Sequence, residues 1–363
     1  MQVTIVGLPG SGKTTVFNAL TGGHAETGGF SGSRAAPNVA VVKVPDDRVD
    51  RLAALFVPKK TIYADVTYVD VAIPAGATRE GTVSPDVLAL VRNADALLHV
   101  VRAFEDAAGT PADPWPDVDE LDLELTVADL SVVEKRLEKL ATQGRHGSQA
   151  ERDLAQREEE LLRRIEPHLS DGRPLRSFGL SDDEELLLRG YRFLTQKPVL
   201  VVLNVDEGRL PDAASLEADG RARYDQPHAD VAALAGKIEA ELAELSDDDA
   251  RPFMDDLGIA EPSRGRIISL TYALLGLFSF FTAGEDECRA WTLRTGSTAV
   301  DAAGTIHSDL ARGFIRAQVI SVDELLDAGS MAEARKRGTL RQEGRDYRVA
   351  DGDVIEVLFN VGR

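Results

Sequence analysis

The sequence feature that most constrains this chain is a glycine-rich segment near its start. Residues 7–14 read G-L-P-G-S-G-K-T, which fits the pattern G-x-x-x-x-G-K-[ST]. The short apolar stretch of residues 2–6 precedes this segment, and the helix-forming T-V-F-N-A-L follows it. Glycines let backbone N–H groups surround phosphate oxygens without a Cβ in the way. Strand, glycine loop and helix in this order therefore predict a phosphate-binding loop.

The polar residues of this loop are those that a nucleoside triphosphate requires. Lys13 would place its ammonium against the β- and γ-phosphates, and this charge stabilisation is the one catalytic role that we assign. Thr14 would offer its hydroxyl to Mg²⁺, and the start of the following helix adds the positive end of a dipole. The predicted nucleotide contacts in the loop are Gly7, Gly10, Ser11, Gly12, Lys13, Thr14 and Thr15.

The rest of the first third of the chain alternates between strands and helices. Residues 39–44 and 62–71 read as paired strands, with a short helix at 46–56 between them. A helix at 85–94 leads into a buried strand at 96–101, in which His99 is predicted to be a core histidine with its hydrogen bonds satisfied. This alternation predicts an α/β fold with a mostly parallel sheet.

A helical segment interrupts the α/β pattern after the proline-rich residues 110–116. Apolar residues recur there at helical spacing: Leu130, Val133, Leu137 and Leu140, then Leu154, Leu161 and Ile165 beyond a glycine-containing turn. The spacing predicts two antiparallel helices with a coiled-coil seam, the second ending at Pro167. A further buried strand at 197–205 follows, so the hairpin is predicted to be inserted into the nucleotide-binding domain.

The end of the chain reads as a separate α+β unit of short strands, a helix and turns. We therefore predict three domains. Residues 1–118 and 195–279 form the nucleotide-binding domain, residues 119–194 form the helical insert, and residues 280–363 form the C-terminal domain.

Residues 204–207, N-V-D-E, lie where a P-loop protein contacts the base. Guanine-specific proteins carry N-K-x-D there, and the aspartate accepts hydrogen bonds from guanine. Glu207 is a longer carboxylate that fits this edge poorly, and Val205 replaces the lysine that flanks the ring. An ordinary loop after a strand is the alternative, and the phosphate-binding loop upstream argues against it.

Asp70 ends a strand and is predicted to hold the metal through a water, together with Thr14. Many P-loop proteins continue from such an aspartate as D-x-x-G, with the glycine beside the γ-phosphate. Here the segment 68–76 reads Y-V-D-V-A-I-P-A-G, and Ile73 takes the place of that glycine. Ile73 is β-branched and precedes a proline, so its backbone is held extended and contacts a phosphate poorly. A rebuilt loop would use Gly76, Arg79 and Gly81.

Taken together, these segments resemble the YchF/Obg-like ATPase family over nearly the whole chain. Seven blocks carry the resemblance: residues 7–21, 36–46, 99–106, 197–207, 280–293, 302–317 and 343–354. It implies a P-loop NTPase G-domain with an inserted antiparallel coiled-coil hairpin and a C-terminal TGS domain of β-grasp shape. It also implies ATP with Mg²⁺ as ligand, and the ribosome or its RNA as partner.

The resemblance implies a preference for ATP over GTP, because this family carries N-x-x-E at the base site. Asn204 and Glu207 match that pattern, and Val205 would contact the adenine edge through its backbone. The family's metal-binding threonine aligns with Arg34, which has no oxygen ligand to give. With Arg34 and Ile73 both unsuited to their places, we expect weak ATP hydrolysis. The alternatives are a nucleotide-stabilised binding module without useful turnover, and a GTP-dependent switch.

Composition limits the partners and the location. A net charge of −20 repels nucleic acid, so RNA binding needs a local basic patch, and no DNA specificity is expected. The candidate RNA patch is Arg335, Lys336, Arg337 and Arg341, and a solvated face is its alternative. The single Cys288 fits a reducing cytoplasm. No apolar run reaches the about 20 residues that span a membrane, and the oligomeric state is left open.

Overall fold

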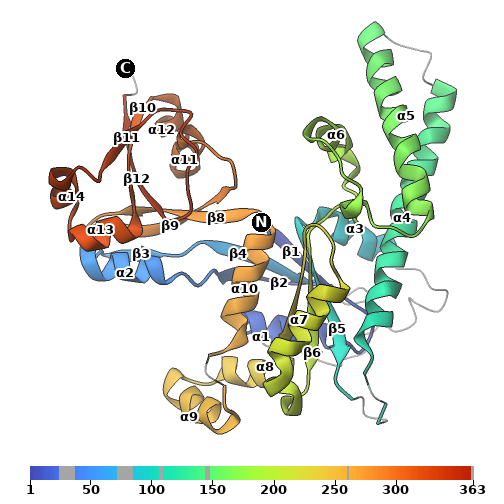
Figure 1. Cartoon of the computed structure of the whole chain (residues 1–363), viewed down its shortest axis with the longest axis horizontal. Coiled ribbons are helices and arrows are strands. Elements are labelled where there is room, and N and C mark those ends of the chain that lie inside the picture. The colour runs from blue at the N-terminus through green and yellow to red at the C-terminus, as the bar shows by residue number, and fades with distance from the viewer. Residues whose placement is uncertain are drawn as a thin grey trace. The chain divides into compact units, whose positions relative to one another are not determined.

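The computed structural model describes residues 1–23, 37–71, 85–105, 109–110, 112–143, 148–259 and 261–360. Contacts between residues divide the chain into two units. Figure 1 shows the chain coloured by residue number. Unit 1 comprises Met1–Ala40 and Thr67–Ile267, and unit 2 comprises Val41–Val66 and Ile268–Arg363. The three domains predicted from the sequence have different boundaries and stay a prediction.

Unit 1 is built on a six-stranded sheet in the order β2-β4-β1-β5-β6-β7. The pairs β1–β4, β1–β5, β5–β6 and β6–β7 are all parallel, which confirms the predicted α/β sheet. Its strands are β1 Gln2–Val6, β2 Asn38–Lys43, β4 Asp65–Asp70, β5 Ala96–Ala103, β6 Val199–Val205 and β7 Ala229–Leu234. Because the paired strands are parallel, the loops that follow them meet at one edge, where ligands bind in such sheets.

The central strands β5 and β6 are buried almost throughout, as expected of parallel strands that are covered on both faces. Their apolar core continues into the helices of the unit. Those helices are α1 Lys13–Thr21, α3 Pro85–Asn93, α7 Ala213–Arg223, α8 Gly236–Glu244, α9 Asp247–Leu257 and, across the boundary between the units, α10 Ser263–Leu274. A short 3₁₀-helix of six residues, η3 Glu207–Asp212, follows β6.

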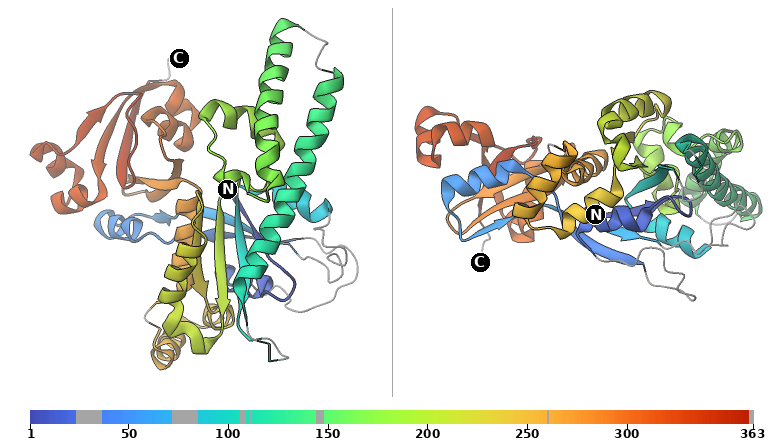
Figure 2. Two further views of the ribbon diagram at one scale, coloured as in Figure 1. Left: turned by 45° about the vertical axis from the view of Figure 1, so that its right-hand side comes forward. Right: turned by 90° about the horizontal axis from the view of Figure 1, so that it is seen from below.

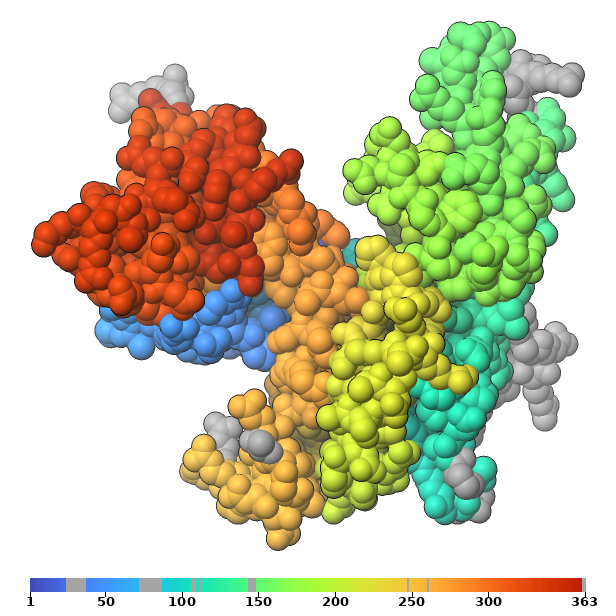
Figure 3. All heavy atoms as spheres, viewed as in Figure 1, coloured from blue at the N-terminus to red at the C-terminus, as the bar shows by residue number. Residues whose placement is uncertain are grey.

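The predicted helical hairpin is present as α4, Pro114–Gln143, and α5, Gln149–Ser170. The two helices lie side by side and antiparallel in both Figure 1 and Figure 2. In the space-filling view of Figure 3, the outer ends of α4 and α5 project beyond the rest of unit 1. The contact is apolar and includes Val133, Leu137, Leu140, Leu161 and Ile165. The sheet resumes after the hairpin with β6, so the hairpin is an insertion, and its coiled-coil geometry stays a prediction.

Three details of the hairpin differ from the sequence analysis. Leu154 is 55% exposed and lies outside the apolar contact. α5 continues past Pro167 to Ser170, because a proline near the end of a helix removes one hydrogen bond and the buried Leu169 still holds the last turn. α4 begins at Pro114, inside the proline-rich residues 110–116 after which the helical segment was expected, since proline is well tolerated in the first turn of a helix.

A buried carboxylate joins the hairpin to the sheet. Asp129 of α4 accepts hydrogen bonds from the backbone N–H groups of Leu194 (2.9 Å) and Thr195 (2.8 Å), and from the Thr195 hydroxyl (2.8 Å). Burial raises the pKa of Asp129, and these hydrogen bonds oppose the rise. The three donors compensate for the loss of water around the carboxylate, so the base of the insert is fixed to the chain that enters β6.

Unit 2 is built on a mixed sheet in the order β11-β10-β12-β8-β9-β3. Its strands are β3 Lys60–Ile62, β8 Leu277–Ala283, β9 Glu287–Arg294, β10 Phe314–Ser321, β11 Arg341–Glu343 and β12 Asp353–Phe359. β12 is parallel to β8 and antiparallel to β10, so this sheet is mixed. The helices are α2 Asp47–Phe56, α11 Ala299–Ile306, α12 Ser308–Arg312, α13 Val322–Ala328 and α14 Met331–Arg337.

The strand predicted at residues 62–71 is two strands in two different sheets. β4 joins the parallel sheet beside β1, and β3 pairs with β9 in the mixed sheet. The helix between β2 and β3 also packs on the mixed sheet, since Arg48 of α2 binds Asp351 at 2.9 Å and lies over the Phe281 ring. Within the described residues, no helix is long and apolar enough to cross a membrane.

Candidate nucleotide-binding site

The loop between β1 and α1 has a backbone that only glycine adopts easily. Gly7, Gly10 and Gly12 have φ angles of 147°, 82° and 91°. A Cβ on Gly7 would collide with the Val100 carbonyl oxygen, and a Cβ on Gly12 would collide with the Asn204 side chain. Space beside Gly10 is open, with no atom within 4 Å of a Cβ built there. The loop therefore has the local geometry of the predicted phosphate cradle.

Lys13 is the first residue of α1, and its side chain lies against the loop. Its Nζ donates a hydrogen bond to the Leu8 carbonyl oxygen at 2.9 Å. Burial lowers the pKa of Lys13, and the nearby Asp70 carboxylate opposes that shift. Charged phosphate oxygens would stabilise this half-buried ammonium better than one neutral carbonyl does, so the residue is well placed to bind them.

Thr14 and Asp70 meet beside the loop, as the sequence predicts for the metal site. The Thr14 hydroxyl donates a hydrogen bond to Oδ2 of Asp70 at 2.9 Å. Asp70 is 1% exposed, and its Oδ1 has no hydrogen-bond partner in the described part of the chain. A buried carboxylate oxygen without a donor beside a hydroxyl fits a hard cation with oxygen ligands, so these residues suit Mg²⁺ held directly or through water.

Asn38 is a member of this cluster that the sequence analysis missed. It is the first residue of β2, and its Nδ2 donates a hydrogen bond to the same Oδ2 of Asp70 at 3.3 Å. Nothing in the sequence indicated this contact, because Asn38 and Asp70 are 32 positions apart and only the pairing of β2 with β4 brings them together.

At the base end, the side chain of Asn204 is bound by protein at both of its ends. Nδ2 donates to the Ser11 carbonyl oxygen at 2.9 Å, and Oδ1 accepts from the Gly236 N–H at 3.0 Å. Asn204 thus connects the phosphate loop to Gly236, the first residue of α8. Gly236 was also missed, although the signal was present as a glycine two positions after the end of a buried strand. A Cβ on Gly236 would lie 2.8 Å from the Asn204 oxygen.

The other two residues predicted to contact the base differ in exposure. Val205 ends β6 with its side chain buried in the core, so only its backbone could reach a base. Glu207 is the first residue of η3 and is exposed. Contacts of Asn204, Val205 and Glu207 with a nucleotide stay predictions.

His99 of β5 lies beside Val6, the last residue of β1, in the parallel sheet. It is 2% exposed, as predicted, but its Nε2 has no hydrogen-bond partner in the described part of the chain. Burial lowers the pKa of His99 to about 4; the nearby Asp122 carboxylate opposes this shift, and the positive charges of Arg176 and Lys13 add to it. His99 is therefore a buried core histidine, and the prediction that its hydrogen bonds are satisfied is wrong.

The predicted RNA patch is largely compensated by nearby acids. Arg337 contacts Asp327 at 3.0 Å and Glu333 at 3.2 Å, and Lys336 lies 3.6 Å from the same glutamate. Arg341 lies 3.5 Å from Glu343 and 3.6 Å from Asp353. Arg335 differs, because its hydrogen bond goes to the neutral Gln318 at 2.9 Å. Arg34, Ile73, Gly76, Arg79 and Gly81 lie outside the described residues.

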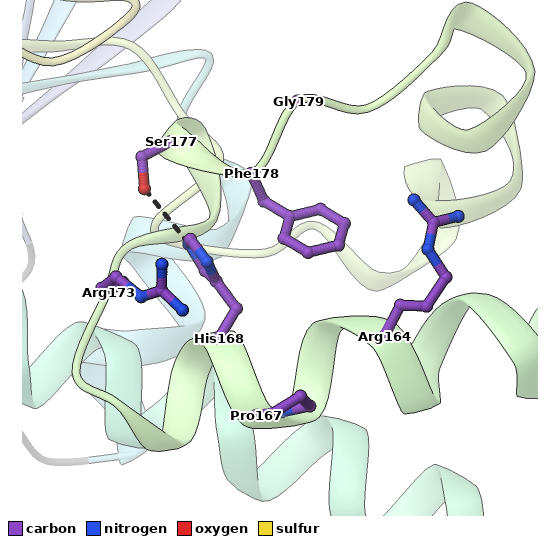
Figure 4. Close-up of a pocket in the computed structure, with 7 residues that line it drawn as sticks. All are labelled: Arg164, Pro167, His168, Arg173, Ser177, Phe178 and Gly179. Carbon is purple, nitrogen blue, oxygen red and sulfur yellow. Dashed lines mark hydrogen bonds between the residues drawn. The ribbon is translucent and has the colours of Figure 1, made fainter.

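A hollow of about 440 Å³ lies at the base of the helical insert (Figure 4). It is lined by Arg164, Pro167, His168, Arg173, Ser177, Phe178 and Gly179. Arg164 is paired with Glu184 at 2.5 Å, and Arg173 is paired with Asp171 at 3.1 Å. Both cations are thus neutralised from outside the hollow, and we assign no ligand to it.

Comparisons with known proteins bear on the whole chain. Residues 2–140 match the family described as "50S ribosome-binding GTPase". Residues 277–360 match YchF-GTPase_C, described as "Protein of unknown function (DUF933)". The "Ribosome-binding ATPase YchF" of Bacillus subtilis is 40% identical over 98% of each chain, and that of Escherichia coli O157:H7 is 37% identical over 98% of each. The structure of the Schizosaccharomyces pombe YchF GTPase matches with a TM-score of 0.85 at 28% identity, covering 99% of this chain and 97% of that one.

Proposed function

The chain belongs to the YchF family, and from this premise we propose that it binds ATP with Mg²⁺ in preference to GTP, hydrolyses ATP slowly and associates with the ribosome. One observation carries the proposal. The glycine loop of residues 7–12, the Lys13 ammonium and the Thr14–Asp70 hydrogen bond lie close together, and in this proposal they would meet the phosphates and the metal of a triphosphate. Thr14 and Asp70 would hold Mg²⁺, which would neutralise charge between the β- and γ-phosphates.

The preference for ATP rests on the segment after β6. An exposed Glu207 stands where guanine-specific relatives place an aspartate, and the buried Val205 offers a backbone edge in place of a lysine. The side-chain amide of Asn204 is bound by Ser11 and Gly236. Recognition of the base is therefore proposed to rest on Val205 and Glu207. The curated relatives are called ATPases, which agrees with this proposal.

Slow hydrolysis follows from two residues of the sequence. Arg34 stands at the place of a metal-binding threonine, and Ile73 at the place of a glycine beside the γ-phosphate. Phosphoryl transfer depends on positioning and charge, and losing positioning costs several kcal/mol, which is about a thousandfold in rate. A binding module without useful turnover is the second candidate, favoured by the same two residues.

Phosphate release with ATP and Mg²⁺, normalised to the number of sites found by ATP titration of the same sample, separates these two candidates. The double variant Arg34→Thr with Ile73→Gly should turn over faster than the wild type, and each single variant should change little because positioning groups act together. A wild type as fast as an ordinary P-loop switch would show that the positioning groups lie elsewhere, first of all at Gly76, Arg79 and Gly81.

Ribosome association is proposed because the relatives are named ribosome-binding ATPases. The cytoplasm is accordingly the proposed location of this protein. Of the predicted RNA patch, Arg335 should matter most, because it binds the neutral Gln318, whereas the charge of Lys336 is compensated by Glu333. Arg335→Glu should weaken co-sedimentation with ribosomes and lower its salt dependence, with the neighbouring Lys336→Glu as the matched control. If both variants sediment like the wild type, the patch is a solvated face, and the helical insert becomes the better candidate.

A further inference from the structure

The strands β10, β11 and β12 of unit 2, labelled in Figure 1, have one face in the core and one face in solvent. Ala317 and Val319 of β10 pack with Ala303 of α11 in one apolar cluster. Side chains alternate between the two faces of a strand, so Arg316 and Gln318 lie on the opposite face. Arg316 is exposed and Gln318 is half-buried, so this second face is open to a partner.

Two arginines lie on this second face, and a glutamine holds each of them. Gln318 of β10 is opposite Gln342 of β11 in the antiparallel register. Arg316 donates a hydrogen bond from Nη1 to Oε1 of Gln342 at 2.6 Å, and Arg335 of α14 donates from Nη2 to Oε1 of Gln318 at 2.9 Å. Neither arginine forms an ion pair within the described residues. We call these four residues the arginine–glutamine face.

The chemistry of the arginine–glutamine face is one-sided. A guanidinium group carries five N–H donors and no acceptor, so each glutamine must give it the amide oxygen. The amide nitrogens and the remaining guanidinium N–H groups are all donors, and both positive charges lack a carboxylate partner. A ligand that matches this face must therefore supply acceptor oxygens and negative charge.

The other cations of the predicted RNA patch differ in this respect. Lys336, Arg337 and Arg341 each have a carboxylate oxygen within 3.6 Å. An anion that binds there must compete with these acids, whereas one that binds Arg316 and Arg335 competes only with neutral amides. The arginine–glutamine face is thus the better place for a negatively charged partner.

One carboxylate lies beside the arginine–glutamine face. Glu356 of β12 is opposite Gln318 in the register, is exposed, and forms no ion pair within the described residues. A negatively charged partner would be repelled by Glu356, and a positively charged partner would be attracted to it. The effect of removing this carboxylate therefore reports the sign of the partner's charge.

We propose that the arginine–glutamine face binds the phosphate backbone of ribosomal RNA. This inference rests on the proposed ribosome association, and it names the surface and the chemical group that make the contact. Phosphate oxygens are negatively charged acceptors, which guanidinium and amide donors match. Because the glutamines already hold both guanidinium groups, less side-chain freedom is lost on binding. Contacts of this kind position the protein on RNA without reading its sequence.

The test measures binding of the full-length protein to intact ribosomes by co-sedimentation and to protein-free ribosomal RNA by titration, each at several salt concentrations. Arg316→Gln removes one phosphate contact. Affinity should fall about threefold to tenfold, and the slope of log affinity against log salt should decrease by about one. Arg316→Lys keeps the charge and should keep most of the slope. Lys59→Gln is the matched control, because this exposed lysine lies beside β3 at the other edge of the sheet and is paired with Asp286.

Glu356→Gln should act in the opposite direction and raise affinity about threefold at low salt, where charge repulsion is least screened. If Arg316→Gln and Glu356→Gln both bind like Lys59→Gln, the inference is wrong. It is also wrong if Glu356→Gln weakens binding, or if the variants change binding to ribosomes and not to protein-free RNA, because the partner is then a protein. A wild type that does not sediment with ribosomes refutes the association itself, and the RNA titrations still decide whether this face binds phosphate.

Discussion

At the phosphate end of the predicted site the backbone carries the geometry, whereas at the base end a few side chains after β6 carry it. The phosphate loop has three glycines at positive φ, and a Cβ would collide at Gly7 and Gly12. After β6, Val205 is buried, Asn204 is bound to protein, and Glu207 is exposed. This difference indicates that most of the affinity should come from contacts with the triphosphate, which ATP and GTP share. Discrimination between adenine and guanine should rest on very few contacts.

The largest expected effect is at Lys13. Lys13→Ala removes the ammonium that would face the β- and γ-phosphates, so ATP and GTP affinity should both fall about a hundredfold or below detection. Titration of both nucleotides measures this, with the exposed Lys135→Ala on α4 as the control. Binding of either nucleotide that survives the Lys13 change would place the site away from this loop.

Low pH should reduce the free energy of unfolding through His99, which lies beside the end of β1 that leads into the phosphate loop. The pKa of His99 is about 4 in the folded chain and about 6.5 when unfolded, so the unfolded state binds its proton first as the pH falls. The stability that His99 contributes is complete above about pH 6.5 and is lost towards pH 4, by up to about 3 kcal/mol. Denaturant unfolding across this range should show a shallower loss for His99→Leu, and equal losses would contradict the depressed pKa.

Asn204 joins the two ends, so its loss should affect both. Asn204→Ala leaves the buried Ser11 carbonyl oxygen and Gly236 N–H without their partner, at a cost of about 1–3 kcal/mol in the free energy of unfolding. ATP and GTP affinity should fall by the same factor, measured by titration beside denaturant unfolding. A selective loss of ATP would mean that Asn204 contacts the base itself, and the comparison of the two ends would need revision.

The smallest effect should come from exchanging the base end alone. Glu207→Asp restores the guanine-specific carboxylate after β6 at an exposed position, and leaves the buried Val205 and the phosphate loop untouched. ATP affinity should fall and GTP affinity rise, each by about tenfold or less, which is about 1.4 kcal/mol. The matched variant Glu207→Gln keeps the length of the side chain and removes its charge, and an unchanged ratio of ATP to GTP affinity in both variants would show that the preference arises elsewhere.

The sequence predicted the parallel sheet, the phosphate loop and the inserted hairpin because each is encoded locally, by glycine spacing or by apolar periodicity. The sequence analysis failed where contacts between segments far apart in the chain determine the structure. Residues 62–71 alternate without a glycine or proline, so nothing marked the change of sheet between β3 and β4. Asn38 and Gly236 acquire their roles only through strand pairing that brings Asp70 and Asn204 to them.

The central claim is that this chain binds ATP in preference to GTP through a phosphate end that both share. The most direct test is equilibrium titration of the wild type with ATP and with GTP, each in the presence of Mg²⁺ and again in EDTA. We predict an ATP affinity about tenfold or more above that of GTP, a gap of about 1.4 kcal/mol, with Mg²⁺ raising both affinities by a similar factor. Equal affinities, or tighter binding of GTP, would contradict the account of the base end.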